Sequence, residues 1–327
     1  LLVTGGAGFI GYHLAKELLG HGYNVVLADN FSRGVSDIFL KELEADERVA
    51  LVSADLTQKN DVARLGEDFD YIFQLAAIIG VQNVLKQAYS VLTKNVELTV
   101  CTIELAKRQK HLKRFVFAST SEVYAGTLQY YQMEIPTPEN TPLTVTPVQH
   151  PRTSYMLSKI YGEALLHQST LPFTIVRPHN FYGPRMGMSH VIPELLKKAY
   201  FAEDGQTLLV ASPSHKRTFC YIDDAVRIIR ELAEAPGAEG QTFNVGNESP
   251  EVTIREVADM MISVVGKPLD IQEGPDTPGS PVRRCPDMSS TRRILGGTGG
   301  IPLKEGIRKT FNWYRDYIFE GNELCEK

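Results

Sequence analysis

The stretch Thr4-Gly5-Gly6-Ala7-Gly8-Phe9-Ile10-Gly11 decides the fold of this chain. Apolar residues 1–4 predict a strand that ends at these glycines, and residues 9–19 predict a helix that follows them. The glycines let the backbone turn sharply and approach a pyrophosphate, while the helix directs its first N–H groups at that anion. Glycine-rich turns are common, but one between a strand and a helix predicts a dinucleotide-binding loop. Its expected contact residues are Gly5, Gly8, Phe9, Ile10 and Gly11.

A carboxylate follows at the end of the second predicted strand, residues 24–28. Asp29 lies 18 residues after Gly11, with Asn30 beside it. A carboxylate at this place can accept hydrogen bonds from both ribose hydroxyls of NAD, and it would repel the additional phosphate of NADP. A turn-forming role for Asp29 is compatible with this one. The glycine loop and Asp29 together predict NAD as the cofactor.

Two further strand ends fit the same ligand. Asp55 and Leu56 follow the predicted strand 49–53, where they would meet the adenine edge. Ala76 and Ala77 follow the predicted strand 70–75, which ends at Leu75, and their small side chains suit a cofactor that passes close to the backbone. An ordinary loop at a strand end would explain either pair by itself.

Strands alternate with helices through the first half of the chain. The remaining expected elements there are strands 114–119 and 173–176 and helices 93–109 and 152–168. This alternation predicts an α/β fold with a doubly wound, mostly parallel sheet of the Rossmann type, because right-handed crossovers place helices on both faces. Residues 124–151 have no clear period and are expected to form a long surface loop.

The pattern becomes less regular after about residue 178. Helices are expected at residues 192–201, 223–234, 254–265 and 304–319, and short strands at 208–210, 243–245 and 269–272. We therefore expect residues 1–178 to form the dinucleotide-binding domain and residues 179–327 a smaller, mixed α/β lobe, with some chain crossing between them.

Composition excludes several classes of protein. The chain has 327 residues and a net charge of −5, which argues against binding nucleic acid through phosphate neutralisation. No apolar run reaches the roughly 18 residues that cross a bilayer. Cys101, Cys220, Cys285 and Cys325 match no metal or disulfide spacing. We expect reduced cysteines, a cytoplasmic protein, and no metal, membrane or nucleic-acid partner.

A second motif carries the chemistry. Tyr155 and Lys159 are four residues apart, so on a helix the phenol and the ammonium share one face. A neighbouring ammonium lowers the pKa of a phenol and makes it a usable base. Such pairs are often merely exposed, but Thr120, Ser121 and Glu122 stand at the end of predicted strand 114–119, and the carboxyl ends of strands line the crevice of a doubly wound sheet.

With these motifs the sequence resembles the extended short-chain dehydrogenase/reductase family, in its nucleotide-sugar epimerase/dehydratase branch. The resemblance covers essentially the whole chain. Further motifs that carry it are Arg177-Pro178-His179-Asn180, Tyr182-Gly183-Pro184-Arg185, Arg217-Thr218-Phe219-Cys220-Tyr221-Ile222-Asp223-Asp224 and Arg284-Cys285-Pro286-Asp287.

The resemblance implies a mechanism. Tyr155, helped by Lys159 and Thr120, removes the proton from the 4-hydroxyl of the sugar, and the hydride passes from C4 to NAD. The 4-keto sugar is then epimerised, dehydrated or decarboxylated. Glu122 is similar to the glutamate of UDP-glucuronate decarboxylases and 4,6-dehydratases, whereas Ser121 stands where dTDP-glucose dehydratases carry Asp.

The leading hypothesis is therefore a UDP-glucuronate decarboxylase-like enzyme. A 4-epimerase or a 4,6-dehydratase is the alternative within the fold. A non-catalytic dinucleotide-binding protein is the alternative outside it, and the presence of both Tyr155 and Lys159 disfavours it.

The resemblance also implies the remaining contacts. Arg217 and Arg284 would bracket the diphosphate, because two guanidinium groups can bind it bidentately. Arg185 or Arg284 would hold the carboxylate of a UDP-sugar substrate. Asn180 and Val191 complete the expected substrate site, and Asn95 the cofactor site. Helices 93–109 and 152–168 would pair with their copies in a homodimer.

Overall fold

The computed structural model describes residues 1–277 and 279–321, without the side chains of residues 81–83. Cys325 lies outside these ranges. The core is a seven-stranded sheet in the order β11-β6-β5-β4-β1-β2-β3, and every neighbouring pair is parallel. Its strands are β1 (Leu2–Thr4), β2 (Val25–Asp29), β3 (Val49–Ser53), β4 (Tyr71–Gln74), β5 (Arg114–Ala118), β6 (Phe173–Pro178) and β11 (Gln241–Val245). The predicted doubly wound parallel sheet is confirmed.

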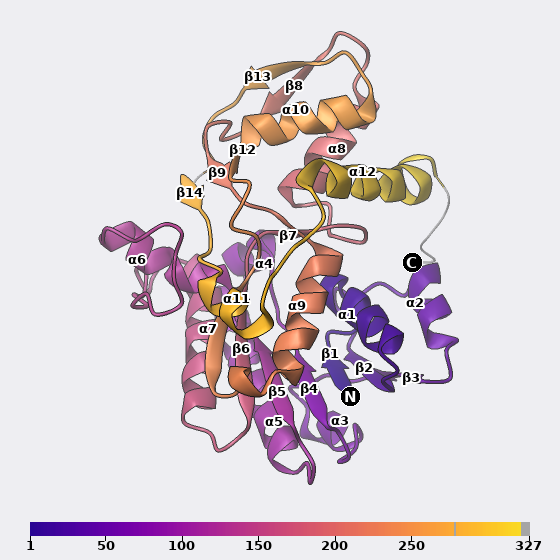
Figure 1. Cartoon of the computed structure of the whole chain (residues 1–327), viewed down its shortest axis with the longest axis vertical. Coiled ribbons are helices and arrows are strands. Elements are labelled where there is room, and N and C mark those ends of the chain that lie inside the picture. Colours follow the sequence, from indigo (N-terminus) through magenta and orange to yellow (C-terminus); the bar gives the residue numbers. More distant parts are fainter. Residues whose placement is uncertain (278, 322–327) are drawn as a thin grey trace.

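Helices cover both faces of this sheet (Figure 1). Alternate strand residues point to opposite faces, so Val3 and Val116 pack into one apolar core while Leu2 and Phe115 pack into the other. The first core contains α1 (Phe9–Gly20) and α9 (Ile222–Glu234). The second contains α5 (Ala88–Lys107) and α7 (Arg152–His167), beside the short α3 (Lys59–Ala63). Two separate cores explain why these strands are apolar on both sides.

A smaller lobe lies beyond the carboxyl ends of the strands (Figure 1). Its larger helices are α8 (Val191–Phe201), α10 (Ile254–Val265) and α12 (Leu303–Tyr314), and a π-helical turn, η3 (Arg315–Phe319), continues α12. Its short strands form three small sheets. In the first, β8 (Thr207–Val210) pairs with β13 (Asp270–Glu273), and in the second, β9 (Lys216–Arg217) lies between β12 (Val252–Thr253) and β14 (Arg283–Arg284). In the third, β7 (Phe181–Tyr182) pairs with β10 (Cys220–Tyr221). No helix in the described ranges is long and apolar enough to cross a bilayer.

Two elements that we expected in the C-terminal lobe belong to the sheet domain. Strand β11 pairs with β6 along its whole length, and α9 packs against α1. The short α11 (Ser289–Leu295) also packs on β11. Local periodicity predicted the strand and the helix but carries no information on their partners. A single boundary at residue 178 therefore does not separate the two regions, because the chain returns to the sheet domain after it.

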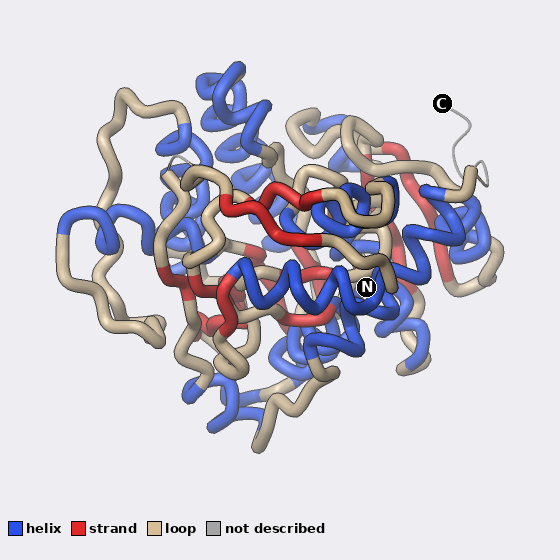
Figure 2. Tube along the Cα trace, turned by 90° about the horizontal axis from the view of Figure 1, so that it is seen from above, coloured by secondary structure: helices blue, strands red, loops and turns tan. Residues whose placement is uncertain are grey.

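The segment expected as an irregular loop begins with helical structure. Residues 121–130 form η1 (Ser121–Tyr124) and α6 (Ala125–Tyr130), and the chain then continues without regular structure to Pro151. This segment projects beside α7 (Figures 1 and 2). Gly126 allows close packing here, because a Cβ on it would overlap the carbonyl of Thr144. A helix of six residues is too short for its period to be recognised in the sequence. Helices α2 (Ile38–Glu44) and α4 (Val81–Lys86), of seven and six residues, are similarly short.

Candidate functional site

A cavity of about 710 Å³ lies at the carboxyl ends of the central strands, between the sheet and the smaller lobe. Nearly all of the predicted site residues line it. From the expected cofactor site these are Gly5, Gly8, Phe9, Ile10, Gly11, Asp29, Asn30, Asp55, Leu56, Leu75, Ala76 and Ala77. From the expected catalytic and substrate sites they are Thr120, Ser121, Glu122, Tyr155, Lys159, Asn180, Arg185 and Arg284. The fold thus brings residues from the whole length of the chain to one place.

The glycine loop makes a tight turn into α1. Gly5 has a φ of +70° and donates its N–H to the carbonyl of Ala28 at 2.8 Å. A Cβ on Gly11 would lie 2.2 Å from the carbonyl oxygen of Gly5, so only glycine fits there. The residue that caps α1 is Gly8, which has no side chain to bond the first N–H groups of the helix. The start of the helix therefore keeps donors and a positive dipole end for an anion.

Asp29 is fixed at the edge of this loop. Its carboxylate accepts the N–H of Ala7 at 3.0 Å and the N–H of Phe31 at 2.8 Å, and the residue is 9% exposed. Burial raises the pKa of Asp29, and the N–H donors act against that shift. The carboxylate is thus held in one orientation beside the glycine loop, where ribose hydroxyls can reach it.

The Tyr155 phenol and the Thr120 hydroxyl both line the cavity, and Thr120 acts to lower the pKa of Tyr155. Lys159 donates to the carbonyl of Ala118 at 2.7 Å and lies 5.9 Å from the centre of the Tyr155 ring. Burial lowers the pKa of Lys159 to about 8. The pKa of Tyr155 is raised by burial and by the charge of Glu122, against the hydrogen bond from Thr120. The expected lowering of this pKa by Lys159 is wrong for this state, because burial dominates and the ammonium is bonded elsewhere.

A buried network of hydrogen bonds and an ion pair supports the segment that carries Thr120 and Glu122. Arg177 on β6 donates to Glu163 on α7 at 2.6 Å and to the phenol of Tyr124 at 2.7 Å. The phenol in turn donates to Asn244 on β11 at 3.0 Å, and His179 bonds the same amide oxygen. Glu163 lies one helical turn after Lys159, so the network ties α7 to β6, β11 and η1. It therefore fixes the segment that carries Thr120 and Glu122.

An ion pair joins Glu122 to Arg284 inside the cavity. Arg284 Nη2 lies 2.7 Å from Glu122 Oε1, and the Glu122 side chain is 41% exposed. Arg284 keeps the pKa of Glu122 below its ordinary value, and Arg152 and Arg217 add weaker attraction. Glu122 is therefore held as a carboxylate beside Tyr155. These two charged side chains belong to η1 and β14, which are distant in sequence and meet only in the tertiary structure.

Three predicted contacts lie outside the cavity lining. Asn95 bonds both backbone groups of Ile78, at 2.7 and 3.0 Å, so it shapes the loop after β4 and has its amide occupied. Arg217 points into the segment after residue 279, where it donates to Ser280 and Pro281, and so does not bracket a diphosphate with Arg284. Val191 is 41% exposed at the start of α8. In each case the sequence indicated the element correctly but not the direction of the side chain.

Two predicted substrate residues line the cavity but are already paired. Asn180 donates to the carbonyl of Thr218 at 2.8 Å. Arg185 forms an ion pair with Asp37 at 2.8 Å, and its side chain is only 5% exposed. Of the two arginines expected to hold a substrate carboxylate, Arg185 is thus bound to Asp37 and Arg284 to Glu122.

The cavity also contains residues that the motifs did not indicate. Arg33 and His190 enter it from the loop after β2 and from the segment before α8, and Trp313, Tyr314 and Ile318 enter it from the C-terminal helix. Tyr314 donates a hydrogen bond to the carbonyl of Met186, which fastens this helix to the cavity wall. No local pattern predicts such contacts, because these residues reach the cavity only when the two regions pack together.

Such a fold and site define an NAD-dependent enzyme of the doubly wound α/β class. Residues 1–246 match the model of the NAD dependent epimerase/dehydratase family. The chain belongs to that family. The match extends over the glycine loop, Asp29 and the Tyr155/Lys159 pair, so the expected branch is confirmed.

Individual relatives cover nearly the whole chain. A UDP-N-acetyl-alpha-D-glucosaminuronate decarboxylase of Bacillus cytotoxicus is 30% identical over 96% of this chain and 97% of its own. UDP-glucuronic acid decarboxylase 6 of Arabidopsis thaliana is 31% identical over 94% of this chain and 86% of its own. Among solved structures, a UDP-glucuronic acid 4-epimerase from Bacillus cereus, in complex with UDP-glucuronic acid and NAD, matches with a TM-score of 0.82 and 26% identity over 96% of this chain and 98% of that one.

The residues present fit NAD. A Cβ at Gly11 would fill the turn that a pyrophosphate needs, the uncapped start of α1 offers N–H donors, and Asp29 is fixed for a ribose diol. NAD is the cofactor of this enzyme, as predicted.

Proposed function

We propose that this enzyme decarboxylates a UDP-linked hexuronic acid through a 4-keto intermediate. The observation that carries the proposal is the Glu122–Arg284 ion pair, which lies in the same cavity as Tyr155 and Thr120. It provides a guanidinium for a substrate carboxylate and a carboxylate that can move a proton beside it.

The first step would be oxidation at C4. Tyr155, as the phenolate, accepts the proton of the 4-hydroxyl, and Thr120 acts to lower the pKa of the same phenol. When bound, NAD supplies the hydride acceptor and a positive charge in the cavity. Lys159, with its pKa lowered to about 8, retains its proton at neutral pH while it is bonded to the carbonyl of Ala118, so the positive charge of bound NAD would be what favours the phenolate.

The second step follows from the position of the ketone. A C4 ketone is β to the C6 carboxylate, so the C5–C6 bond can break, carbon dioxide leaves, and the electron pair passes into the enolate. The substrate carboxylate would take Arg284 from Glu122. Glu122 then loses the cation that keeps its pKa low, so it can take up a proton from water and deliver it to C5. To complete the cycle, the hydride would return to C4 and Tyr155 would return its proton to the C4 oxygen, so that the net change is the loss of carbon dioxide.

The same residues argue against dehydration. Loss of a 6-hydroxyl needs an acid beside the leaving oxygen. Ser121, which is 6% exposed, is not such an acid, and Glu122 is held ionised by Arg284. Two decarboxylases among the relatives support the proposal. The solved 4-epimerase, in complex with UDP-glucuronic acid, favours 4-epimerisation as the second candidate.

The test is the mass of the product. The protein is incubated with UDP-glucuronate, UDP-N-acetylglucosaminuronate, UDP-glucose and GDP-mannose. Loss of the mass of carbon dioxide is expected from a uronate. Loss of the mass of water would indicate a dehydratase, and an isomer of unchanged mass an epimerase. If both uronates remain inert, decarboxylation is excluded.

A matched pair of variants tests the role of Glu122. Glu122→Gln keeps the shape but removes the charge, so we expect decarboxylation to fall roughly 10²- to 10⁴-fold. Glu251→Gln breaks the neighbouring Arg283–Glu251 pair, at 2.7 Å and outside the cavity lining, and should leave the rate unchanged. Equal losses in both variants would show that Glu122 only stabilises the lobe.

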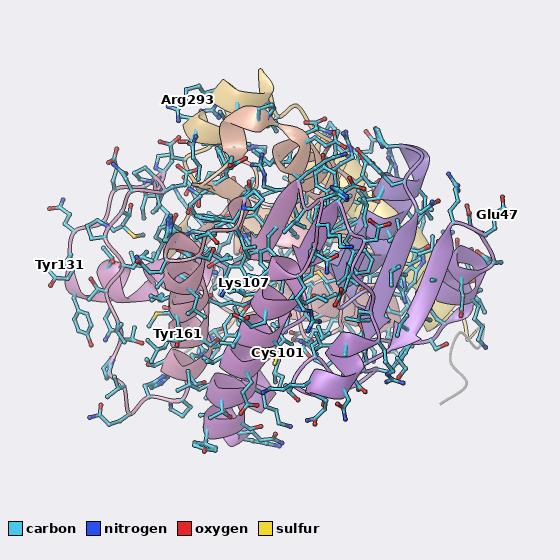
Figure 3. All side chains as sticks on the ribbon, turned by 90° about the horizontal axis from the view of Figure 1, so that it is seen from below. Glu47, Cys101, Lys107, Tyr131, Tyr161 and Arg293 are labelled. Carbon is cyan, nitrogen blue, oxygen red and sulfur yellow. The ribbon has the colours of Figure 1, made fainter. Side chains whose placement is uncertain are left out.

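We also propose a homodimer built on α5 and α7. Both helices run along the outside of the sheet domain, where Tyr161 and Cys101 are visible (Figure 3). Tyr89, Val100 and Tyr161 are 84%, 38% and 45% exposed, which is typical of apolar side chains awaiting a partner. Light scattering at micromolar concentration should give twice the mass of the chain, and Tyr161→Glu should lower it. A monomeric wild-type protein would contradict the proposal.

The proposed compartment is the cytoplasm. The described cysteines Cys101, Cys220 and Cys285 are unpaired, as a reducing compartment favours. Fractionation of cells with an antibody to the protein tests this proposal, and recovery in a secreted fraction would contradict it.

A further inference from the structure

Arg185 joins two segments of the chain that both line the cofactor cavity. It belongs to the segment that follows β7. Its Nε donates to Oδ2 of Asp37 at 2.8 Å, and its Nη2 donates to the carbonyl of Val35 at 3.2 Å. Its guanidinium also stacks on Tyr12, with 4.2 Å to the ring centre.

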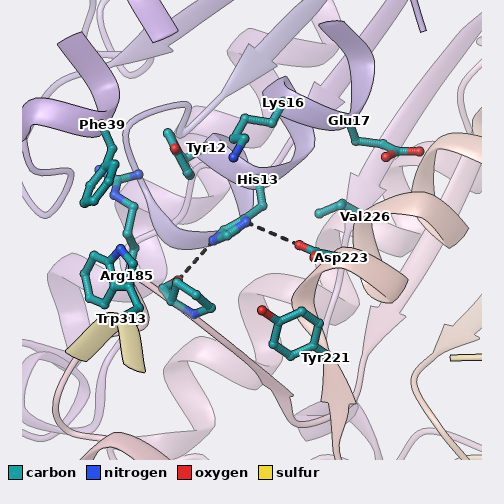
Figure 4. A pocket seen from close by; sticks show the side chains of 11 residues that line it. Tyr12, His13, Lys16, Glu17, Phe39, Arg185, Tyr221, Asp223, Val226 and Trp313 are labelled. Carbon is teal, nitrogen blue, oxygen red and sulfur yellow. Dashed lines mark hydrogen bonds and ion pairs between the residues drawn. The ribbon is translucent and has the colours of Figure 1, made fainter. Parts of the chain in front are cut away.

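Arg185 forms part of the wall between two cavities. It lines the cofactor cavity and also a smaller neighbouring one of about 420 Å³. In that second cavity Arg185 lies among Phe39, Tyr12 and Trp313 (Figure 4). The Arg185 and Asp37 side chains are 5% and 8% exposed, so water screens the pair weakly.

Asp37 organises the loop that borders the adenosine side. Its Oδ1 accepts the N–H of Leu40 and caps α2 at 2.9 Å, while its Oδ2 accepts from Arg185. Residues 30 and 32–35 of this loop line the cofactor cavity directly after Asp29. The position of the cavity rim is therefore set by one carboxylate that is bonded on both sides.

The backbone of Arg185 is strained in this arrangement. Its φ is +64°, in the left-handed region that non-glycine residues adopt rarely. One guanidinium nitrogen, Nη1, is also buried without a hydrogen-bond partner among the described residues. Strain and an unsatisfied donor persist only where the surrounding contacts outweigh them. The ion pair with Asp37 and the stack on Tyr12 are those contacts.

We infer that the Arg185–Asp37 pair is a latch that closes the rim of the cavity and retains NAD. Both partners must separate before the loop of residues 30–37 can move away from the cofactor. Arg185 is a positioning residue in this scheme, acting through Asp37 on the loop. The inference needs NAD binding but not decarboxylation, so it stands or falls independently of the proposed reaction.

The test measures release of NAD rather than turnover. Asp37→Asn is the primary variant, because asparagine still caps a helix but carries no charge for Arg185. The protein is loaded with NADH, and the fluorescence change on dilution into excess NAD gives the dissociation rate. We expect Asp37→Asn and Arg185→Lys to release NADH at least about tenfold faster, since lysine cannot reproduce the forked and stacked contacts.

Arg230→Lys provides the matched control. Arg230 is 10% exposed and pairs with Glu17 at 2.9 Å and Glu234 at 2.7 Å, but it lies outside the cavity lining. Arg230→Lys should leave the NADH dissociation rate unchanged. The double variant Asp37→Asn/Arg185→Lys should release NADH no faster than whichever of the two single variants releases it faster. A wild-type rate in Asp37→Asn, or an equal increase in Arg230→Lys, would overturn the latch.

Discussion

Gly11 allows the sharpest test of the cofactor loop. A Cβ at this position would lie 2.2 Å from the carbonyl oxygen of Gly5, whereas real Cβ contacts essentially never fall below 3.0 Å. Gly11→Ala must therefore displace the loop from α1 by at least about 0.8 Å, the difference between the two distances. The neighbours are backbone atoms of Gly5 and Gly6, which have no flexible end that could move aside.

The displacement has two expected costs. Overpacking of this kind lowers the free energy of unfolding by about 1–3 kcal/mol. It also misaligns the N–H groups that face the pyrophosphate, and a hydrogen bond to a charged group contributes roughly 1.5–3 kcal/mol. Loss of one such bond weakens NAD binding by about tenfold or more. Urea denaturation of the cofactor-free protein measures the first cost, and titration calorimetry with NAD measures the second.

Gly20→Ala, at the other end of the same helix, is the control. A Cβ there has no atom within 4 Å, so the substitution should leave NAD binding unchanged and stabilise the chain by up to about 1 kcal/mol. If Gly11→Ala bound NAD as tightly as the wild type and unfolded at the same urea concentration, the steric account of the loop would be refuted.

Three further outcomes are expected. Tyr155→Phe should lower kcat roughly 10²- to 10⁴-fold with NAD binding retained, whereas Tyr161→Phe, 45% exposed on the same helix, should not change it; full activity of the first variant would remove Tyr155 from the mechanism. Arg177→Met leaves the buried Glu163 carboxylate without its partner and should cost about 3–5 kcal/mol in urea unfolding, and a loss below 1 kcal/mol would contradict that account. Burial lowers the pKa of Lys159 from 10.5 to about 8, so between these pH values the unfolded chain holds this proton more tightly than the folded one. The free energy of unfolding should therefore rise with pH across that window, relative to that of Lys159→Met. Parallel curves of unfolding free energy against pH for the two proteins would disprove this pKa shift.

The cofactor loop and the catalytic pair were predictable because their geometry is local. Residues 2–20 form one continuous strand–turn–helix unit, and Tyr155 and Lys159 occupy one helical face. The strand ends that carry Asp29 and Thr120 follow from alternation of strands and helices, because parallel strands end at the same edge of the sheet. For these residues, order along the chain already implies position in space.

Arginine partners were not predictable in the same way. Arg185, Arg217 and Arg284 were all expected to contact the substrate. Arg284 lines the cavity, where it pairs with Glu122, 162 residues away in sequence, whereas Arg217 lies outside the lining. Arg185 instead pairs with Asp37, 148 residues away. A long guanidinium side chain can reach several acceptors, and the choice depends on which segments pack beside it.

The sequence by itself determined the parallel sheet, the NAD site and the Tyr155/Lys159 pair, since short-range spacing and hydrophobic period specify them. Only the tertiary structure decided that β11 joins the main sheet, that Glu122 is held ionised by Arg284, and that Asp37 receives Arg185. These contacts depend on how two distant segments meet, and on the burial that then fixes each charge to one partner. The periodic pattern of the sequence does not indicate which distant segments meet or which charges become buried together.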